Sequence, residues 1–293
     1  MESPRPQLII LADAPDALCI LFGISLLERL LRIVQRLGFR DAVILSDSKE
    51  VTDHLAAPSW ARADVALSFQ RKNAGTVNVV EIPTGTDGIL IVSAGFYYDA
   101  RLLKALAEQS TTTLLVDSAP SPDCARLRRT SLPAAALVGR NWLSRQDQSA
   151  ELMNQLISDA AAGKIETCDA AQQPTYIMPL RKHVRPVFFP APSSNQLPVA
   201  QRFVRDIAQN GVLDFPGLMD SPIEDWIVAR LCRTSITPNQ ITFVTMLIGL
   251  IVTAFFATGH RRWGVVLDYV MDMLDGVVGK VARSTCRTTN VGQ

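Results

Sequence analysis

An uncharged apolar run near the carboxyl end of the chain, ITFVTMLIGLIVTAFFATG at 241–259, constrains the fold more than any other feature. Its length is about what an α-helix needs to cross the hydrocarbon core of a bilayer. A fully buried helix inside a soluble domain is the alternative interpretation of the same composition. Because no charge interrupts the run, we expect a membrane-spanning helix here.

A second apolar segment, Val265–Lys280, is interrupted by Asp268, Asp272 and Asp275. It is too short and too acidic to insert into a membrane by itself. At successive steps of four, three and four residues, the three aspartates and Gly279 share one face of a helix. Because carboxylates are costly at membrane depth, we expect this face to line a protein cavity and to be functional.

Two shorter helical patterns precede the apolar run, at Pro198–Asn210 and Pro222–Leu231. The apolar side of the second is formed by Ile223, Trp226, Ile227 and Leu231. Such an amphipathic helix is expected either at a bilayer surface or docked on protein.

The chain from residue 7 to about 165 alternates short apolar runs with helical patterns, which is typical of an α/β domain with a Rossmann-like, mostly parallel sheet and flanking helices. The expected strands are Gln7–Ala12, Ala42–Leu45, Val77–Ile82, Gly88–Val92 and Thr113–Asp117. The expected helices are Ser25–Leu37, one that begins at Asp99, and Ala150–Ala162.

Composition changes between Pro174 and Pro198, where prolines interrupt every helical pattern. We therefore expect an α/β domain at 1–170 and a proline-rich linker or domain rim at 171–200. Amphipathic juxtamembrane helices are expected at 201–235, followed by an all-α membrane domain at 236–293 with one to two transmembrane helices.

The charge balance excludes one class of partner. There are 29 Lys and Arg residues against 28 Asp and Glu, a net charge of +1, so nothing favours general binding to nucleic acid. The five cysteines form no CxxC pair and the amino terminus has no signal-peptide pattern. Both observations favour a reduced, cytoplasmic setting for the α/β domain, attached to the inner or cytoplasmic membrane through later segments.

The most specific motif is LDGVVGKVARSTCRTTNVG at 274–292. It resembles the signature of the CDP-alcohol phosphotransferase family, which runs Asp, two residues, Asp-Gly, two residues, Ala-Arg, eight residues, Gly. The residues that match it are Asp275, Gly279, Ala282, Arg283 and Gly292. Val278 replaces the second aspartate, and the last two aspartates of the signature would fall beyond Gln293.

An alternative register begins at Asp272 and continues with Asp275 and Gly276. It keeps two carboxylates but departs from the signature at the Ala-Arg pair and at the later glycine, which makes it the poorer match. As a hypothesis, Asp272 partly replaces the aspartate lost at Val278, because it lies one helical turn from Asp275.

The octapeptide SITPNQIT at 235–242 is similar to the segment that precedes the first membrane helix of the same family. Its matching residues are Pro238, Asn239 and Thr242. Pro238 suits the first turn of a helix, because proline has no amide hydrogen to satisfy.

The resemblance implies displacement of CMP from a CDP-linked donor by an alcohol acceptor, as in phospholipid or phosphodiester biosynthesis. It implies Asp275 as the catalytic residue, and Mg²⁺ or Mn²⁺ between the diphosphate and Asp275, with Asp272 as a second candidate ligand. The implied CDP-binding residues are Asp275, Gly279, Ala282, Arg283, Gly292, Pro238, Asn239 and Thr242. The lipid bilayer and a second copy in a homodimer are further implied partners.

Residues 7–165 resemble sugar-nucleotidyltransferase domains, and the whole chain resembles fusions of an inositol-phosphate cytidylyltransferase with a di-myo-inositol-phosphate-phosphate synthase. The resemblance rests on LLER at 26–29 and on ILIVSAGFYYDARLLKAL at 89–106. The glycine-rich loop that would hold a triphosphate is missing at 11–19, and Gly95 stands where a metal-binding aspartate is expected. We therefore do not expect nucleotidyl transfer by this domain.

Two functions stay open. The first is a membrane transferase of the CDP-alcohol phosphotransferase type. The second is an inactive, membrane-tethered nucleotidyltransferase-like scaffold or truncated gene product, which Val278 favours. A soluble nucleotidyltransferase is disfavoured by Gly95.

Overall fold

The computed structural model describes residues 6–56, 67–72, 88–127, 134–143, 152–209, 215–234 and 236–286. The chain divides into an α/β unit, made of 1–21, 25–175 and 185–200, and a helical unit, made of 22–24, 176–184 and 201–293. The expected strand Val77–Ile82 lies outside the described residues, as does Gly292.

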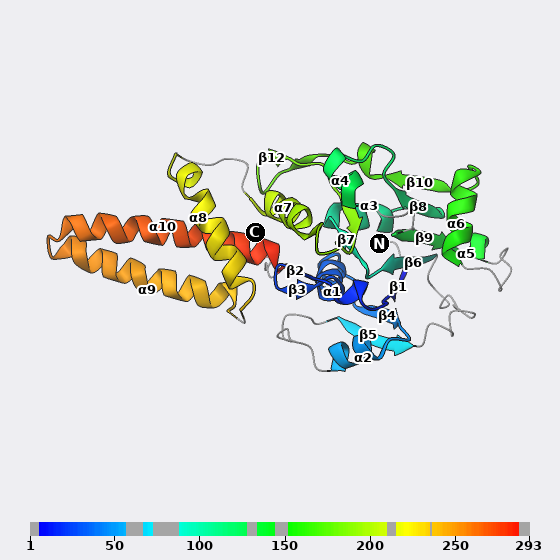
Figure 1. Cartoon of the computed structure of the whole chain (residues 1–293), viewed down its shortest axis with the longest axis horizontal. Helices are drawn as coiled ribbons and strands as arrows, with labels where there is room; N and C mark the ends of the chain where they lie inside the picture. The colour runs from blue at the N-terminus through cyan, green and yellow to red at the C-terminus, as the bar shows by residue number, and fades with distance from the viewer. Residues whose placement is uncertain are drawn as a thin grey trace, which may run out of the picture. The chain divides into compact units, whose positions relative to one another are not determined.

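A seven-stranded sheet forms the centre of the α/β unit, with strand order β10-β8-β9-β6-β1-β4-β5 (Figure 1). The strands are β1 Gln7–Leu11, β4 Asp41–Leu45, β5 Ser68–Lys72, β6 Gly88–Ser93, β8 Thr113–Val116, β9 Ala135–Gly139 and β10 Glu166–Asp169. All neighbours run parallel except at β9, which is antiparallel to both β6 and β8. The expected α/β class with a mostly parallel sheet is therefore confirmed.

The central strands of the sheet are apolar throughout because both of their faces are buried. Strand β6 lies between β1 and β9, and its residues Ile89, Leu90 and Val92 are completely buried. Successive side chains point to opposite faces, so both faces of this strand are covered, as is usual for a parallel sheet. Each buried Leu or Ile stabilises the fold by about 1.5–3 kcal/mol.

Helices of the α/β unit begin where the sequence supplies caps. They are α1 Leu26–Arg36, α2 Lys49–Ala56, α3 Ala100–Ala107, α4 Pro122–Leu127, α5 Arg140–Leu143 and α6 Leu152–Ala161. The Ser25 hydroxyl accepts a hydrogen bond from the Glu28 amide at 3.1 Å, and the Asp99 carboxylate accepts one from the Arg101 amide at 3.0 Å. The helices expected at Ser25, Asp99 and Ala150 are all present.

The proline-rich segment contributes a strand to the α/β unit. Strand β13, Phe188–Pro190, pairs antiparallel with β7, Phe96–Tyr98, and the Tyr97 ring stacks on Phe189 at 4.8 Å between centroids. The remaining short elements are β2 Ile20–Leu21, β3 Ile24–Ser25, β11 Tyr176–Ile177, β12 Lys182–His183 and 3₁₀ helices at Asp16–Leu18 and Ala170–Gln172.

The helical unit contains α7 Leu197–Ala208 from residue 201 onward, together with α8 Phe215–Leu231, α9 Pro238–Ala257 and α10 Arg261–Ser284. Helices α9 and α10 run side by side as a hairpin, joined at Gly259, whose φ of +79° is a left-handed conformation that glycine adopts without strain (Figure 1). The apolar run at 241–259 therefore lies almost wholly within one helix, α9.

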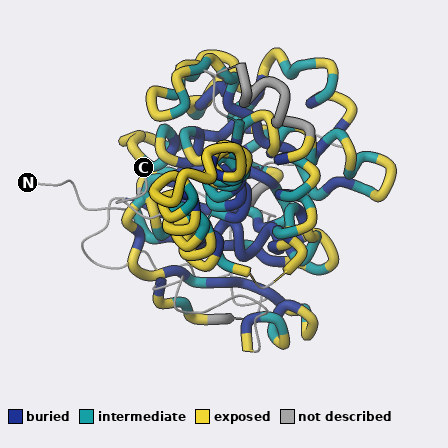
Figure 2. The backbone as a smooth tube through the Cα atoms, turned by 90° about the vertical axis from the view of Figure 1, so that its left-hand side faces the viewer, coloured by how far each residue is buried: buried dark blue, intermediate teal, exposed yellow. Residues whose placement is uncertain are grey.

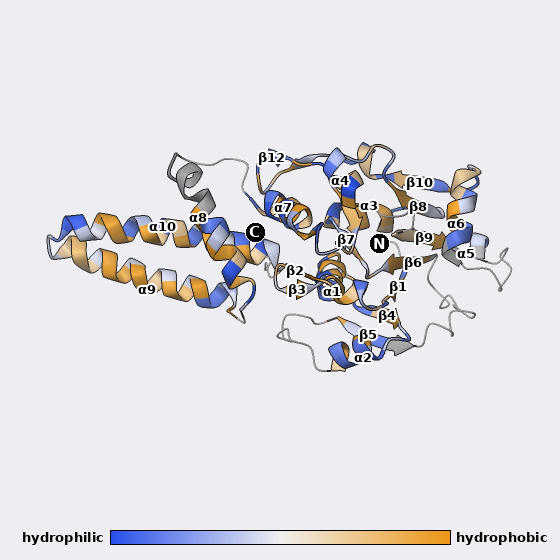
Figure 3. Ribbon diagram, in the orientation of Figure 1, coloured by the Kyte–Doolittle hydropathy of each residue, from blue (hydrophilic) through white to orange (hydrophobic). Residues whose placement is uncertain are grey.

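Most of α9 is exposed. Phe243, Leu250 and Ile251 are 49–62% exposed, and the hairpin is mostly apolar in Figure 3 and mostly exposed in Figure 2. Among the described residues, α9 is the one helix long and apolar enough to cross a membrane. The alternative of a fully buried core helix does not fit this exposure.

Candidate functional site

Three exposed aspartates follow one another along α10. Asp268, Asp272 and Asp275 lie on a single face at the spacing that brings side chains into line on a helix, and Gly279 continues this line with partial burial. We call this face the acidic stripe. Among the residues that the structure describes, none forms a hydrogen bond or ion pair with these three carboxylates.

The opposite face of α10 is packed against apolar side chains. Val277 and Val281 belong to a buried cluster that also contains Val228, Cys232 and Ile241, here called the apolar cluster. Val278 is partly buried and packs against it. The position where the first register requires a second aspartate therefore belongs to the packed side of the helix.

Lys280 is paired with carboxylates of α8 rather than free to meet a phosphate. Its Nζ lies 2.8 Å from Glu224 Oε2 and 2.9 Å from Asp225 Oδ1, and its side chain is 5% exposed. Arg205 Nε lies 3.5 Å from Asp225 Oδ2, which adds α7 to the same network. Gly276 makes room for it, because a Cβ there would lie 2.5 Å from Glu224 Oε1.

Arg283 contacts the end of another helix. Its Nε donates a hydrogen bond to the carbonyl of Ala208, the last residue of α7, at 2.6 Å. The guanidinium lies over Gly279, where a Cβ would approach Nη1 at 3.0 Å and Nη2 at 3.2 Å. No sequence pattern predicts this contact, because its partners are 75 residues apart.

The start of α9 is a well-formed helix cap. Thr237 and Gln240 exchange hydrogen bonds between side chain and backbone, and Pro238 occupies the first turn as expected. Asn239 and Thr242 are exposed, and the Thr242 hydroxyl donates to the Pro238 carbonyl at 3.1 Å. No hydrogen bond links this helix start to the acidic stripe among the described residues.

The fit to a divalent cation is limited to a pair of ligands. Within the described ranges, no three side chains of His, Cys, Asp or Glu gather closely enough to hold a metal ion. Mg²⁺, however, is commonly bound by one or two carboxylates together with substrate phosphates. Asp272 and Asp275, one turn apart and both exposed, fit that kind of shared site.

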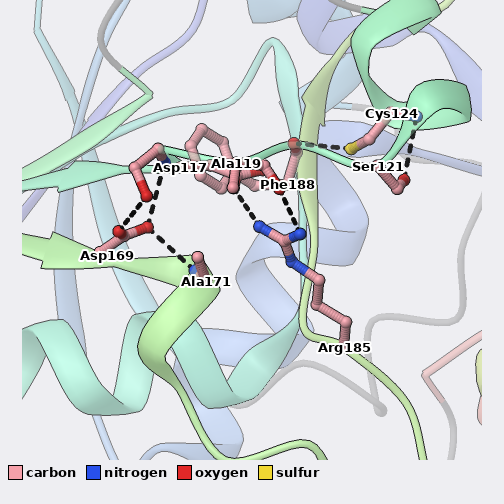
Figure 4. A network of polar contacts seen from close by, with 9 residues as sticks. Asp117, Ala119, Ser121, Cys124, Asp169, Ala171, Arg185 and Phe188 are labelled. Atoms are coloured by element: carbon pink, nitrogen blue, oxygen red, sulfur yellow. Dashed lines mark hydrogen bonds and ion pairs between the residues drawn. The ribbon is translucent and has the colours of Figure 1, made fainter.

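The carboxyl edge of the sheet in the α/β unit also carries acidic residues, and each has a protein partner (Figure 4). Asp117, directly after β8, is paired with Arg185, which also donates to the Ala119 carbonyl. Asp169, at the end of β10, accepts hydrogen bonds from the Ser118 hydroxyl at 2.5 Å and amide at 3.1 Å. Sequence reasoning missed this cluster, although carboxyl ends of neighbouring parallel strands are a known gathering place for polar residues.

The pKa of Asp169 is shifted by opposing causes. Burial acts to raise it, but the hydrogen bonds from Ser118 and from the Ala171 amide, with the charge of Arg185, together hold the pKa below its usual value. The Asp169 carboxylate is therefore ionised and satisfied at neutral pH, and it serves the fold.

Gly95 is closely enclosed in the α/β unit. Its carbonyl accepts a hydrogen bond from the Ala191 amide at 2.8 Å, and a Cβ would lie 3.1 Å from Asp16 Cβ. Cys19 nearby has a pKa raised by burial and by the charge of Asp16, so its thiol stays protonated at neutral pH. All five cysteines are free thiols.

Aspartates in a row on the second helix of an apolar hairpin mark this helix as a candidate functional site. Residues 235–293 match the family model described as CDP-alcohol phosphatidyltransferase. The family is membrane-associated and implies a CDP-linked donor and an alcohol acceptor.

Three solved structures are similar to 67–69% of the chain. HddC from Yersinia pseudotuberculosis has 8% identity and a TM-score of 0.44, covering 67% of this chain and 98% of its own. The inositol-1-phosphate CTP transferase from T. maritima has 9% identity and a TM-score of 0.43, covering 69% and 96%.

UDP-glucose pyrophosphorylase complexed with UDP-glucose has 8% identity and a TM-score of 0.45, covering 67% of this chain and 97% of its own. Because all three TM-scores are below 0.5, we base the description of the fold on the strand order alone. A comparison with curated proteins finds no match.

Proposed function

We propose that the chain is a membrane CDP-alcohol phosphotransferase-type protein, which transfers a substituted phosphate group from a CDP-linked donor to an alcohol with release of CMP. The observation that carries the proposal is the acidic stripe, whose carboxylates are exposed and have no described protein partner. Buried or paired carboxylates such as Asp117 serve the fold, whereas unpaired ones in a row are available to a ligand.

The geometry favours Asp272 and Asp275 as the working pair. Both are exposed on one face, one turn apart, whereas Val278 packs against the apolar cluster. The two exposed carboxylates of the motif region are therefore Asp272 and Asp275, while Gly279, Ala282 and Arg283 keep the register that begins at Asp275.

The proposed reaction forms a bond between the alcohol oxygen and the phosphorus that carries the substituent. The bond from that phosphorus to the bridging oxygen breaks, and CMP leaves with the electron pair. In this proposal Asp275 takes the proton of the attacking alcohol, and Asp272, exposed one turn away on the same helix, assists it. Mg²⁺ or Mn²⁺, held by these two residues and the diphosphate, would neutralise the negative charge of the donor.

The remaining motif residues are proposed to form the CDP site. They are Gly279, Ala282, Arg283, Gly292, Pro238, Asn239 and Thr242. Membrane attachment through α9 is part of the proposal, supported by its length and by its exposed apolar surface. A homodimer and a cytoplasmic position of the α/β unit belong to the same proposal.

Release of CMP by membranes that contain the protein tests this function, with a panel of CDP-linked donors and alcohols. Asp275→Asn and Asp272→Asn should each lower the rate by about a hundredfold or more, as expected when a proton acceptor or metal ligand is lost. Asp268→Asn, one turn away on the same stripe, is the matched control and should keep most of the activity. Unchanged release by Asp275→Asn would contradict the proposal.

An inactive membrane-tethered scaffold is the second candidate function. It is favoured by Val278 at a signature aspartate and by Gly95, closely packed where a nucleotidyltransferase would need a carboxylate. No release of CMP from any donor, by protein that is folded and retained in membranes, would support the scaffold over the transferase.

A further inference from the structure

The carboxyl end of α7 is held by two cationic side chains from distant parts of the chain. The last carbonyls of a helix have no partner within it, and positive charge is favoured there by the helix dipole. Lys182 Nζ donates to the carbonyls of Asp206 and Gln209, and Arg283 Nε donates to that of Ala208 at 2.6 Å. Lys182 therefore fixes the helix end to which Arg283 is attached.

This contact uses one of the five N–H groups of the guanidinium. Neither Nη1 nor Nη2 donates a hydrogen bond to any residue that the structure describes, and the side chain is only partly buried. Both nitrogens lie beside Gly279, one turn after Asp275 on the acidic stripe. An arginine fixed at Nε still presents its outer pair of nitrogens, the geometry that grips a phosphate with two bonds.

Gly279 is what allows the guanidinium to lie there. A Cβ at this position would lie 3.0 Å from Nη1 and 3.2 Å from Nη2, which is tighter than most packing contacts. The guanidinium would have to shift by a few tenths of an ångström, and Nε would move with it relative to the Ala208 carbonyl. A glycine at this position thus serves Arg283.

We propose that Gly279 and the carboxyl end of α7 are positioning elements that hold Arg283 with Nη1 and Nη2 free to bind the diphosphate of the CDP-linked donor. The inference rests on the proposed function for its ligand, and it assigns Gly279 an indirect role. If Gly279 acts only through Arg283, its substitution has no effect once Arg283 is gone.

Equilibrium binding of CDP, with Mg²⁺, to the detergent-solubilised protein tests the coupling. Gly279→Ala should weaken binding about tenfold, the scale of one charge-assisted hydrogen bond, and Arg283→Ala at least as much. The double variant should bind CDP as Arg283→Ala does. Gly249→Ala is the matched control on α9, because its Cβ would meet a side chain at a similar distance, Met271 Sδ at 3.2 Å, and would not touch Arg283.

Hydrogen exchange in the last turn of α7 tests the positioning contact without any ligand. The Gln209 amide is bonded to the Arg205 carbonyl at 2.9 Å within that turn. Arg283→Ala and Gly279→Ala should each speed exchange there by about tenfold, whereas Gly249→Ala should not. Arg283→Lys should restore the protection but not the CDP affinity, because lysine reaches a carbonyl yet lacks the two-nitrogen edge.

Three results would overturn the inference. The first is that Gly279→Ala and Arg283→Ala have additive effects on CDP binding. The second is that Gly279→Ala binds CDP normally. The third is that hydrogen exchange in α7 is unchanged in both single variants. Failure of the wild-type protein to release CMP, with CDP binding intact, would instead contradict only the proposed reaction.

Discussion

At the scale of single residues, the packing of Val278 changes how the motif is interpreted. Sequence spacing placed a lost aspartate here, yet the side chain packs against the apolar cluster and the exposed carboxylates precede it at Asp272 and Asp275. The spacing did predict that these aspartates share a face. It could not predict which side of α10 would be covered, because that depends on α8, about 50 residues earlier in the chain.

Val278→Asp should therefore destabilise the protein and give no gain in CMP release. A carboxylate placed against the apolar cluster costs about 1–3 kcal/mol, because it has no partner there. Thermal unfolding in detergent measures the loss, and Val278→Ala, which removes volume without adding charge, should lose less. If Val278→Asp is as stable as the wild type and releases CMP faster, the first register of the motif, which has an aspartate at position 278, is the right one.

The stability of the α/β unit should depend on pH through the ionisation of Asp169. Its folded pKa lies below the usual value despite burial, because Ser118, Ala171 and Arg185 favour the ionised form. A carboxyl of this kind stabilises the fold above its unfolded pKa of about 3.9, and the contribution is lost as pH falls through the lower, folded value. The melting temperature should therefore fall more steeply on acidification in the wild type than in Asp169→Asn.

The matched control for this comparison is Asp123→Asn. Asp123 is 45% exposed, and its ion pair with Arg126 at 3.4 Å is on the surface. Its substitution should leave the acid limb of the melting curve unchanged. Equal acid sensitivity of Asp169→Asn and the wild type would show that Asp169 is not the group responsible.

At the scale of elements, apolar runs and helix caps predicted the central strands and the helices, but not the edge strands or the direction of every strand. Strands β1, β4, β6 and β8 were expected from continuous apolar residues. Strands β5 and β10, SFQRK and ETCD, lie at the two edges of the sheet and are polar, so no apolar pattern marks them. Strand β9 has small alanines and runs antiparallel, a direction that composition does not encode.

The attachment of α8 to α10 depends on Lys280. Lys280→Ala would leave Glu224 and Asp225 without their main partner, and breaking a buried pair of this kind costs about 3 kcal/mol. Hydrogen exchange should rise along α8 more than along α9. Adding Glu224→Gln and Asp225→Asn to Lys280→Ala should recover part of the stability, and no recovery would contradict the ion-pair explanation.

At the scale of the whole molecule, the proposed function surrounds the α/β unit with water and the helical unit with lipid. The first is covered by its own helices, whereas the second exposes the apolar side of α9. That exposure is unfavourable in water and favourable in a bilayer, so the proposed function predicts that the helical unit contacts lipid.

Leu250→Arg tests this requirement. Leu250 is 62% exposed near the middle of α9, and an arginine at the centre of a membrane helix costs about 3 kcal/mol on insertion. The variant should be released from membranes by an alkaline wash that leaves the wild type and Leu250→Ala in place. Equal retention of all three proteins would contradict lipid contact at this position.

The cap at Thr237 and Gln240 has a consequence for everything that follows it in the chain. Because the reciprocal bonds fix the residue at which α9 starts, they also fix the rotation of the helix about its axis. Starting one residue earlier or later would turn each later side chain of α9 by about 100°, and would shift the partners it offers to α10. This short segment thus determines which side chains of α9 face α10.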